Sequence, residues 1–277
     1  MNQKDLHEKI LYPVTRVKAG KAGGSGVLVY SEPDPEDSGK YINIILTCQH
    51  VIDGAISVKD EWDSLLKREI KKDIKEEVAN EVFDYDGSKI SSANSSQAEI
   101  IAYDKGHDLA AIKLRNSRPQ EYVASIYPKD GIDDLQLFDD VWTSGCSLLH
   151  DPFASKGELT YLREMIDQKS YIMYNAPSIF GNSGGGVFHG ENGTLLGLCS
   201  RITSIQLGFG IDVMTWMGFG THPSRLYEFF EHHELQFIYD GSNYYDAQER
   251  RKERQRKSLR HLFIEEKDAD KVEVLET

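Results

Sequence analysis

Residues 181–185 read Gly-Asn-Ser-Gly-Gly, which sets the hydroxyl of Ser183 among three glycines. Because glycine has no Cβ, the backbone N–H groups of such a turn are free to converge on one point. Acyl transfer needs this arrangement, an oxygen nucleophile beside preorganised donors for the oxyanion of a tetrahedral intermediate. The same residue types also form ordinary turns, so the pentapeptide alone indicates this chemistry without establishing it.

Two other segments supply the remaining groups of a catalytic triad. Residues 47–51, Thr-Cys-Gln-His-Val, follow an apolar run and place His50 at the end of an expected strand, and Asp108 begins the alternating run 108–114. Taken singly, His50 fits a strand-end histidine, Asp108 a turn cap and Ser183 a turn serine. Together they give base, acid and nucleophile in one of the orders in which the triad recurs, which favours a triad.

On these motifs the chain resembles the trypsin-like serine peptidases of the chymotrypsin double-barrel fold, and most of all the bacterial Deg/HtrA type without a PDZ domain. The likeness spans about residues 10–230. The matching blocks are 23–29 with 46–52, 98–104 with 107–110, and 181–188 with 195–198 and 208–211. The ordered set is more specific than any single block.

The resemblance implies an all-β fold of two six-stranded antiparallel β-barrels, about residues 10–120 and 135–220, within a peptidase domain at 1–240. Short alternating runs broken by Gly, Pro, Asp and Ser in the first part of the chain also favour a barrel over βαβ units. Residues 223–237 are expected to close the domain as a C-terminal helix with one apolar face.

Residues 59–84 carry a different pattern. Apolar residues recur there at every fourth position: Trp62, Leu66, Ile70, Ile74, Val78 and Val82. With charged residues between them, they predict an amphipathic helix inserted in the first barrel. The simpler interpretation packs this helix against the barrel. The alternative gives it a role as a lid, or in binding a regulatory partner or a second copy of the chain.

The segment 241–277 divides by charge into a basic part, 249–260, and an acidic part, 265–276. Such charge runs are typical of solvated, flexible segments. The net charge of −13 argues against nucleic-acid binding by the chain as a whole, with the basic residues 250–260 as a weak exception.

The three cysteines, Cys48, Cys146 and Cys199, cannot all pair within one chain, so reduced thiols are expected. The N-terminal residues lack the apolar core of a signal peptide, and no apolar run reaches membrane-spanning length. These features predict a cytoplasmic protein without membrane contact. Neither Cys-x-x-Cys nor His-Glu-x-x-His occurs, so no metal and no cofactor is expected.

The resemblance also implies roles for individual residues. Ser183 would be the nucleophile, His50 its base and Asp108 the acid that orients the base. The backbone N–H groups of Gly181 and Ser183 would form the oxyanion hole. Asn182 stands where digestive relatives have the aspartate that binds a newly released N-terminus, so activity without N-terminal processing is expected.

The same likeness assigns substrate selection. Pro177 stands six residues before the serine, at the position that forms the base of the S1 pocket in digestive relatives, and a proline cannot pair with a substrate Lys or Arg. Ser200, Arg201 and Ile202 are expected to form the edge strand that holds an extended substrate backbone. Two residues are expected to narrow the pocket: Phe209 and Ile211. A small or medium apolar P1 side chain fits these assignments.

Together these features predict a serine endopeptidase that cleaves extended or unfolded polypeptides through an acyl-enzyme. The alternative, from another class, is a catalytically weak, protease-like binding or regulatory module. An esterase is disfavoured, because the α/β-hydrolase elbow expects G-x-S-x-G in a strand-turn-helix and its acid after the serine.

Overall fold

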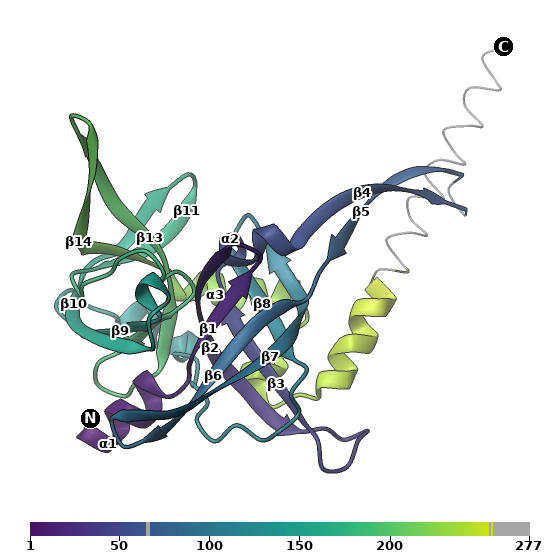
Figure 1. Ribbon diagram of the computed structural model, residues 1–277, viewed down its shortest axis with the longest axis horizontal. Coiled ribbons are helices and arrows are strands. Elements are labelled where there is room, and N and C mark those ends of the chain that lie inside the picture. Colours follow the sequence, from purple (N-terminus) through teal and green to yellow (C-terminus); the bar gives the residue numbers. More distant parts are fainter. Residues whose placement is uncertain (65–66, 255, 257–277) are drawn as a thin grey trace. The chain divides into compact units, whose positions relative to one another are not determined.

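The structure, a computed structural model, describes residues 1–64, 67–254 and 256. It shows two closed antiparallel β-barrels of six strands each (Figure 1). The first barrel contains β1 (Val14–Ala19), β2 (Ala22–Pro33), β3 (Tyr41–Thr47), β6 (Val78–Asp86), β7 (Lys89–Asp104) and β8 (Leu109–Leu114). The second contains β9 (Asp140–Gly145), β10 (Phe153–Ile166), β11 (Lys169–Tyr174), β12 (Gly186–His189), β13 (Leu195–Leu207) and β14 (Gly210–Thr221). The fold class predicted from the sequence is confirmed.

Apolar side chains fill both barrels, because removing them from water is the main force that holds such sheets closed. On β3 the consecutive residues Ile44, Ile45 and Leu46 are all fully buried. The core cluster of the second barrel is drawn from five of its strands: Val141, Leu159, Ile172, Val187 and Leu196. The predicted triad residues lie beside strand ends of the two barrels: His50 after β3, Asp108 before β8 and Ser183 before β12.

The chain divides into two compact units. The first, Met1–Ser57 with Lys75–Phe229, holds both barrels. The second, Val58–Ile74 with Phe230–Thr277, holds most of a two-stranded sheet made of β4 (Ile56–Asp63) and β5 (Arg68–Lys75). The short helical segments are α1 (Gln3–Leu6), η1 (His7–Leu11), α2 (Gln49–Ile52), η2 (Asp53–Ala55), η3 (Lys129–Asp134), η4 (Ser147–Leu149) and α4 (Phe237–Asp240).

The helix predicted at 59–84 is wrong, because the described part of this segment forms strands β4, β5 and the start of β6. A spacing of four residues places side chains on one face of a helix, but it is also an even number, which places them on one face of a strand. Four of the spaced residues are β-branched and favour strands: Ile70, Ile74, Val78 and Val82. Leu66 lies outside the described residues. The partner role suggested for a helix here loses its basis.

The closing helix is confirmed as α3 (Pro223–His232), whose Leu226, Phe229 and Phe230 are fully buried. Residues 244–254 are also helical, where the charge pattern predicted a flexible segment. In this helix Arg250 and Arg254 pair with Glu234, which explains why a charged sequence is ordered there. The remainder of the charged segment, 257–277, lies outside the described residues. None of the described helices is long and apolar enough to cross a membrane.

Candidate active site

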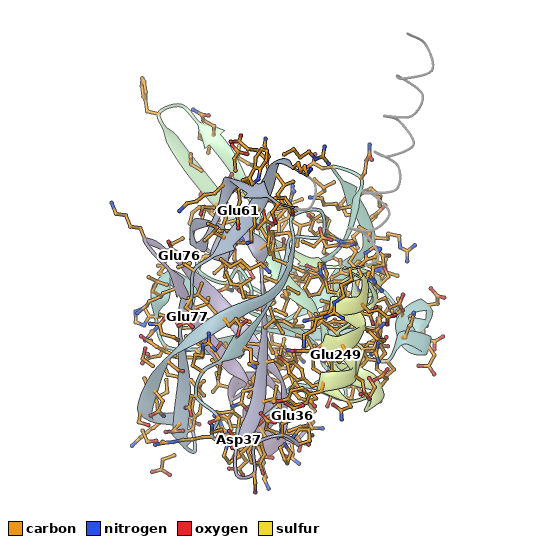
Figure 2. The ribbon with its side chains drawn as sticks, turned by 90° about the vertical axis from the view of Figure 1, so that its right-hand side faces the viewer. Glu36, Asp37, Glu61, Glu76, Glu77 and Glu249 are labelled. Atoms are coloured by element: carbon orange, nitrogen blue, oxygen red, sulfur yellow. The ribbon has the colours of Figure 1, made fainter. Side chains whose placement is uncertain are left out.

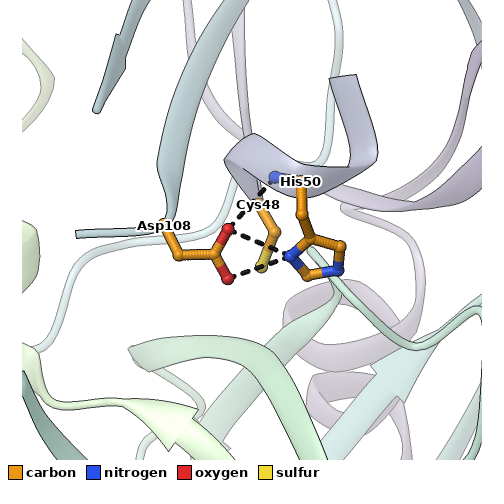
Figure 3. Close-up of side chains that lie close together, drawn as sticks. All are labelled: Cys48, His50 and Asp108. Carbon is orange, nitrogen blue, oxygen red and sulfur yellow. Dashed lines mark hydrogen bonds and ion pairs between the residues drawn. The ribbon is translucent and has the colours of Figure 1, made fainter. Parts of the chain in front are cut away.

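His50 and Asp108 meet at the end of the first barrel. His50 lies on α2, directly after β3, and Asp108 immediately precedes β8, the strand that pairs with β3. The Nδ1 atom of His50 lies 3.0 Å from each carboxylate oxygen of Asp108 (Figure 3). The backbone N–H of His50 also donates to Oδ1 of Asp108, at 3.1 Å. Asp108 therefore holds both the ring and the backbone of His50.

The carboxylate of Asp108 is kept ionised by its partners. Burial would raise its pKa, but hydrogen bonds and the nearby charge of His50 outweigh burial, and the hydroxyl of Ser200 donates to Oδ2 at 2.7 Å, so the pKa is lowered. An ionised Asp108 accepts a proton-bearing Nδ1, which leaves Nε2 of His50 as the ring atom able to accept a proton. This is the tautomer that a general base needs.

Ser183 lies in the turn before β12, and the first barrel holds this turn in place. The backbone N–H of Ser25 on β2 donates to the carbonyl of Ser183 at 2.8 Å, and the N–H of Gly184 donates to Cys199 at 2.8 Å. Ser183 and His50 line one cavity of about 310 Å³. Within the described residues no hydrogen bond joins the Ser183 hydroxyl to the His50 ring, and such contacts often tighten only when substrate binds.

Two backbone N–H groups beside Ser183 are available as donors. The carbonyl of Phe180 accepts from the N–H of Leu148 at 2.8 Å. Because the C=O and N–H of one trans peptide point in opposite directions, the N–H of Gly181 points away from Leu148. Within the part of the chain that the structure describes, neither this N–H nor that of Ser183 donates to a protein group. The arrangement can stabilise an oxyanion.

The residues that line the cavity differ partly from those expected. Ser200, Arg201 and Ile202, the predicted substrate-binding residues, are among those that line it. Pro177 does not form its base, because this side chain is exposed and absent from the lining. The buried residues Tyr174 and Ser178 line the cavity instead, and their hydroxyl oxygens lie 3.2 Å apart. Successive residues of an extended segment point to opposite sides. The side chain of Pro177 therefore faces solvent, while that of its neighbour Ser178 faces the cavity.

Phe209 and Ile211 were expected to narrow the pocket, and this is wrong. Both are exposed, at 113% and 71% of their reference surface, and neither lines the cavity. They lie around the turn that joins β13 to β14, so the long strands of this hairpin carry them away from Ser183.

The acidic excess of the chain does not reach this cavity. Exposed carboxylates lie on several elements (Figure 2): Glu36, Asp37, Glu61, Glu76, Glu77 and Glu249. Among the described residues that line the cavity there is no Asp or Glu. A cavity without an acidic group offers no ion pair to a Lys or Arg side chain.

The comparisons with known proteins agree with this geometry. The family model for the trypsin-like peptidase domain matches residues 24–198. The chain belongs to this family. No curated protein matches the sequence.

Two solved structures have a similar fold. One is an HtrA-type protease, AlgW, in a variant with a tripeptide, with a TM-score of 0.58 and 16% identity. The likeness covers 87% of this chain and 65% of that one. The other is Deg5, with a TM-score of 0.56, 16% identity, and coverage of 85% and 93%. At this identity the likeness shows the fold alone. Family and fold together place the chain among trypsin-like peptidase domains.

Ser25 is a positioning residue that the sequence did not single out in this trypsin-like domain. Its hydroxyl donates to the carbonyl of Gly181 at 2.7 Å and accepts from the N–H of Cys146 at 2.7 Å. The residue is fully buried. Ser25 therefore links the first barrel to the serine turn at Gly181 and to Cys146, which directly follows β9. Its only sequence signal was its place within one block of the resemblance.

Asn182 is buried, and neutral groups satisfy its side chain. The hydroxyl of Ser147 donates to the side-chain oxygen of Asn182. The side-chain nitrogen of Asn182 donates to the hydroxyl of Ser178 at 3.4 Å. In this trypsin-like domain the position thus needs no charged partner, which agrees with the expectation that no new N-terminus has to pair with it.

His107 fixes the backbone that carries Asp108, a role that no pattern in the sequence indicates. The Nδ1 atom of His107 lies 3.0 Å from Asp104 and its Nε2 atom 3.0 Å from Glu228. Its carbonyl accepts from Arg225 on α3. The next residue, Asp108, has a φ of 56°, a left-handed conformation that is strained for a residue other than glycine. These contacts hold the carboxylate in place against that strain.

Cys48, His50 and Asp108 form a group whose ligand atoms lie within 4.8 Å of one another, as metal ligands do (Figure 3). The thiol of Cys48, however, donates to the carbonyl of Cys199 at 3.3 Å, and burial raises the pKa of this thiol well above its ordinary value. A protonated thiol is not a metal ligand. His50 and Asp108 are already bonded to each other, so the group fits a His–Asp pair better than a metal site.

The substitution Gly181→Ala tests whether the backbone N–H of residue 181 has to point toward the oxyanion site. Gly181 has a φ of +94°, and an added Cβ would lie 2.5 Å from the backbone nitrogen of Leu148 and 2.8 Å from the carbonyl oxygen of Cys146. Backbone atoms cannot yield as a flexible side chain does, so the N–H of residue 181 must turn. We expect the rate of peptide cleavage to fall on the order of 10²–10³-fold, as when one oxyanion donor is lost.

Gly39→Ala is the matched control, because Gly39 has a similar φ of +88° but nothing lies within 4 Å of an added Cβ. This variant should lose about 1–2 kcal/mol of stability from the left-handed backbone and keep its activity. Undiminished cleavage by Gly181→Ala, with its fold verified by circular dichroism, would remove the N–H of residue 181 from the oxyanion hole.

Proposed function

We propose that the chain is a serine endopeptidase in which Ser183 is the nucleophile, His50 the general base and Asp108 the residue that orients the base. The observation that carries this proposal is the cavity shared by Ser183 and a His50 ring bonded to an ionised carboxylate. A serine hydroxyl is a weak nucleophile without such a base. The free N–H groups of Gly181 and Ser183 supply the second requirement, an oxyanion site.

The reaction proceeds in two halves. The Oγ atom of Ser183 attacks the carbonyl carbon of the substrate while Nε2 of His50 takes its proton, and the N–H groups of Gly181 and Ser183 receive the oxyanion. His50 then gives the proton to the departing amine as the C–N bond breaks, which leaves an ester on Ser183. In the second half, His50 takes a proton from water, the resulting hydroxide attacks the ester, and the proton returns to Ser183.

The substrate is an extended segment of polypeptide. β13 leaves the cavity at Ser200, Arg201 and Ile202, and an extended peptide can add to this strand through backbone hydrogen bonds. Folded domains rarely offer such segments, so unfolded or flexible regions are the targets. The buried residues Tyr174 and Ser178 line the cavity of about 310 Å³ and the lining has no acid, which favours a small or medium apolar P1 residue over Lys or Arg.

Covalent labelling with a fluorophosphonate probe tests the proposal, because the probe bonds only to an activated serine. We expect one adduct per chain, mapped by mass spectrometry to the peptide containing Ser183, and none on heat-unfolded protein. Casein digested in parallel should show cleavage after small or medium apolar residues. Absence of labelling together with intact casein would instead support the protease-like binding module, and cleavage after Arg would contradict the assigned cavity preference.

A further inference from the structure

The hairpin formed by β13 and β14 has a surface unlike that of the remaining chain. Residues 202–217 contain one ionisable side chain, Asp212, although 28% of the whole sequence is charged. Three large apolar side chains near its turn are well exposed, Leu207 at 61%, Phe209 at 113% and Ile211 at 71%. Figure 1 shows this hairpin extending beyond the second barrel. Exposed apolar surface of this kind marks an interaction site.

One backbone edge of this hairpin has no partner strand. β13 pairs with β12 as far as Leu198, and Cys199 exchanges hydrogen bonds with the serine turn. From Arg201 to Leu207 every backbone pair that β13 makes within the described residues goes to β14. The opposite edge of β13 therefore presents its N–H and C=O groups to any extended chain that approaches.

This free edge begins at the cavity of Ser183. Ser200, Arg201 and Ile202 line the cavity, and the same strand continues without a break to Leu207. A peptide with one side chain in the cavity and its backbone on β13 would therefore reach the exposed apolar side chains after a few more residues. The cavity and the apolar hairpin thus form one continuous surface.

We propose that residues 202–217 are a substrate arm that binds an extended apolar segment located four to eight residues before the cleaved bond. The proposal rests on the proposed function and names the class of substrate, namely unfolded polypeptides with an apolar stretch on the N-terminal side of the cleaved bond. It requires no conformational change, because the edge is already exposed.

The direction of the bound chain follows from strand geometry. β13 runs from the cavity to the turn, so an antiparallel partner runs from the turn to the cavity and meets Ser183 at its C-terminal end. Antiparallel pairing is the more stable of the two arrangements. In such a pair, each step of one residue along β13 corresponds to one step back along the substrate. If the P1 residue lies beside Ser200, the sixth and eighth residues before the cleaved bond therefore lie beside Ile205 and Leu207.

The position of the free edge of β13 beside the cavity favours a substrate chain over two other possible binding partners, a second copy of the protein and a lipid surface. A second copy paired along this edge would cover Ser200, Arg201 and Ile202 and close the approach to the cavity. A lipid surface would contact the turn but would leave the N–H and C=O groups of the free edge without partners, which is costly in an apolar medium. Only an extended polypeptide satisfies both the edge and the apolar side chains.

Peptide binding to Ser183→Ala protein tests the arm without turnover. Each fluorescein-labelled peptide has a common core of three residues on either side of the scissile bond. One carries five Val and Leu residues before the core, one carries five Ser and Gly residues there, and one carries the apolar residues after the core. Anisotropy should show about tenfold tighter binding for the first peptide than for the other two. Adding Leu207→Ser and Phe209→Ser should abolish this difference.

Leu137→Ser with Phe138→Ser is the matched control, since these side chains are exposed but lie outside the hairpin. The tenfold difference should persist in it, and the bare core peptide should bind all variants alike. A difference that survives the hairpin substitutions, or equal binding of the two apolar peptides, would refute the arm.

Two further measurements separate the other occupants. If the hairpin substitutions lower the mass in sedimentation velocity, or release the protein from phosphatidylcholine vesicles, while peptide affinity is unchanged, the proposal is also refuted. Wild-type labelling and cleavage of the bare core peptide report on the proposed function separately, so failure of catalysis leaves the binding result interpretable.

Discussion

Replacing Ser183 with alanine should lower the kcat/KM for peptide cleavage on the order of 10⁶-fold, the loss seen when the nucleophile of a serine peptidase is removed. The alanine lacks the oxygen that attacks the carbonyl and forms the ester, while the oxyanion donors and the cavity remain. The measurement uses a quenched fluorescent peptide with an apolar P1 residue. Fluorophosphonate labelling of the variant should be absent.

Ser38→Ala provides the control for that loss, because Ser38 is an exposed serine in the connection between β2 and β3. It should retain full activity and labelling. The expected loss for Ser183→Ala is on the order of 10⁶-fold. If this variant instead kept more than about one per cent of the wild-type rate, a loss of less than roughly 100-fold, a nucleophile other than Ser183 would have to operate.

The two barrels could be predicted from the sequence because short, local patterns of residues indicate their strands. The apolar run around Ile45 and the alternation after Asp108 each indicate a strand, and the order of three short motifs indicates which double barrel the strands form. The positions of His50 and Asp108 at strand ends follow from the same patterns. The pairing of β3 with β8 then brings the two residues close together.

The contacts that hold the serine turn could not be predicted in the same way. Ser25 is separated from Gly181 by 156 residues, and Arg225 from His107 by 118 residues. No local pattern records which distant backbone carbonyl a buried serine or arginine will meet. Such residues look like ordinary strand and helix residues in the sequence, and only the packing of the barrels and α3 gives them their roles.

Two of the incorrect predictions from the sequence have a related physical cause. The four-residue spacing of Ile70, Ile74 and Val78 satisfies helix and strand periodicity alike, so β-branching was the only local evidence for strands. Pro177 was placed in the cavity by counting from the serine, although the pointing direction alternates with each residue of an extended chain. In the first case the spacing did not determine the type of secondary structure, and in the second it did not determine the direction of the side chain.

Asp108→Asn should lower kcat/KM on the order of 10⁴-fold while leaving the fold intact. In the wild type both carboxylate oxygens accept from Nδ1 of His50 at 3.0 Å. An asparagine replaces one oxygen with an N–H₂ group, which can donate to Nδ1 and so move the ring proton to Nε2. His50 then cannot take a proton from Ser183.

The same variant tests the ionisation of Asp108 through stability. Burial would raise the pKa of Asp108, but its hydrogen bonds with His50 and Ser200 lower it overall. A carboxylate with a lowered pKa stabilises the folded state above the unfolded-state pKa of about 3.9, and this contribution is lost as the pH falls through the folded-state value. The difference in free energy of unfolding between wild type and Asp108→Asn should be constant above about pH 5 and shrink below it.

Asp53→Asn is a suitable comparison for both measurements. Asp53 also has a lowered pKa, through hydrogen bonds from Gln49 and Lys105, and it lies three residues after His50 without contacting the ring by a hydrogen bond. It should show the same acid-dependent stability difference on a smaller scale and almost no change in kcat/KM. If Asp53→Asn and Asp108→Asn reduced activity equally, the loss would reflect negative charge near His50 in general, and the orienting role of Asp108 would have to be abandoned.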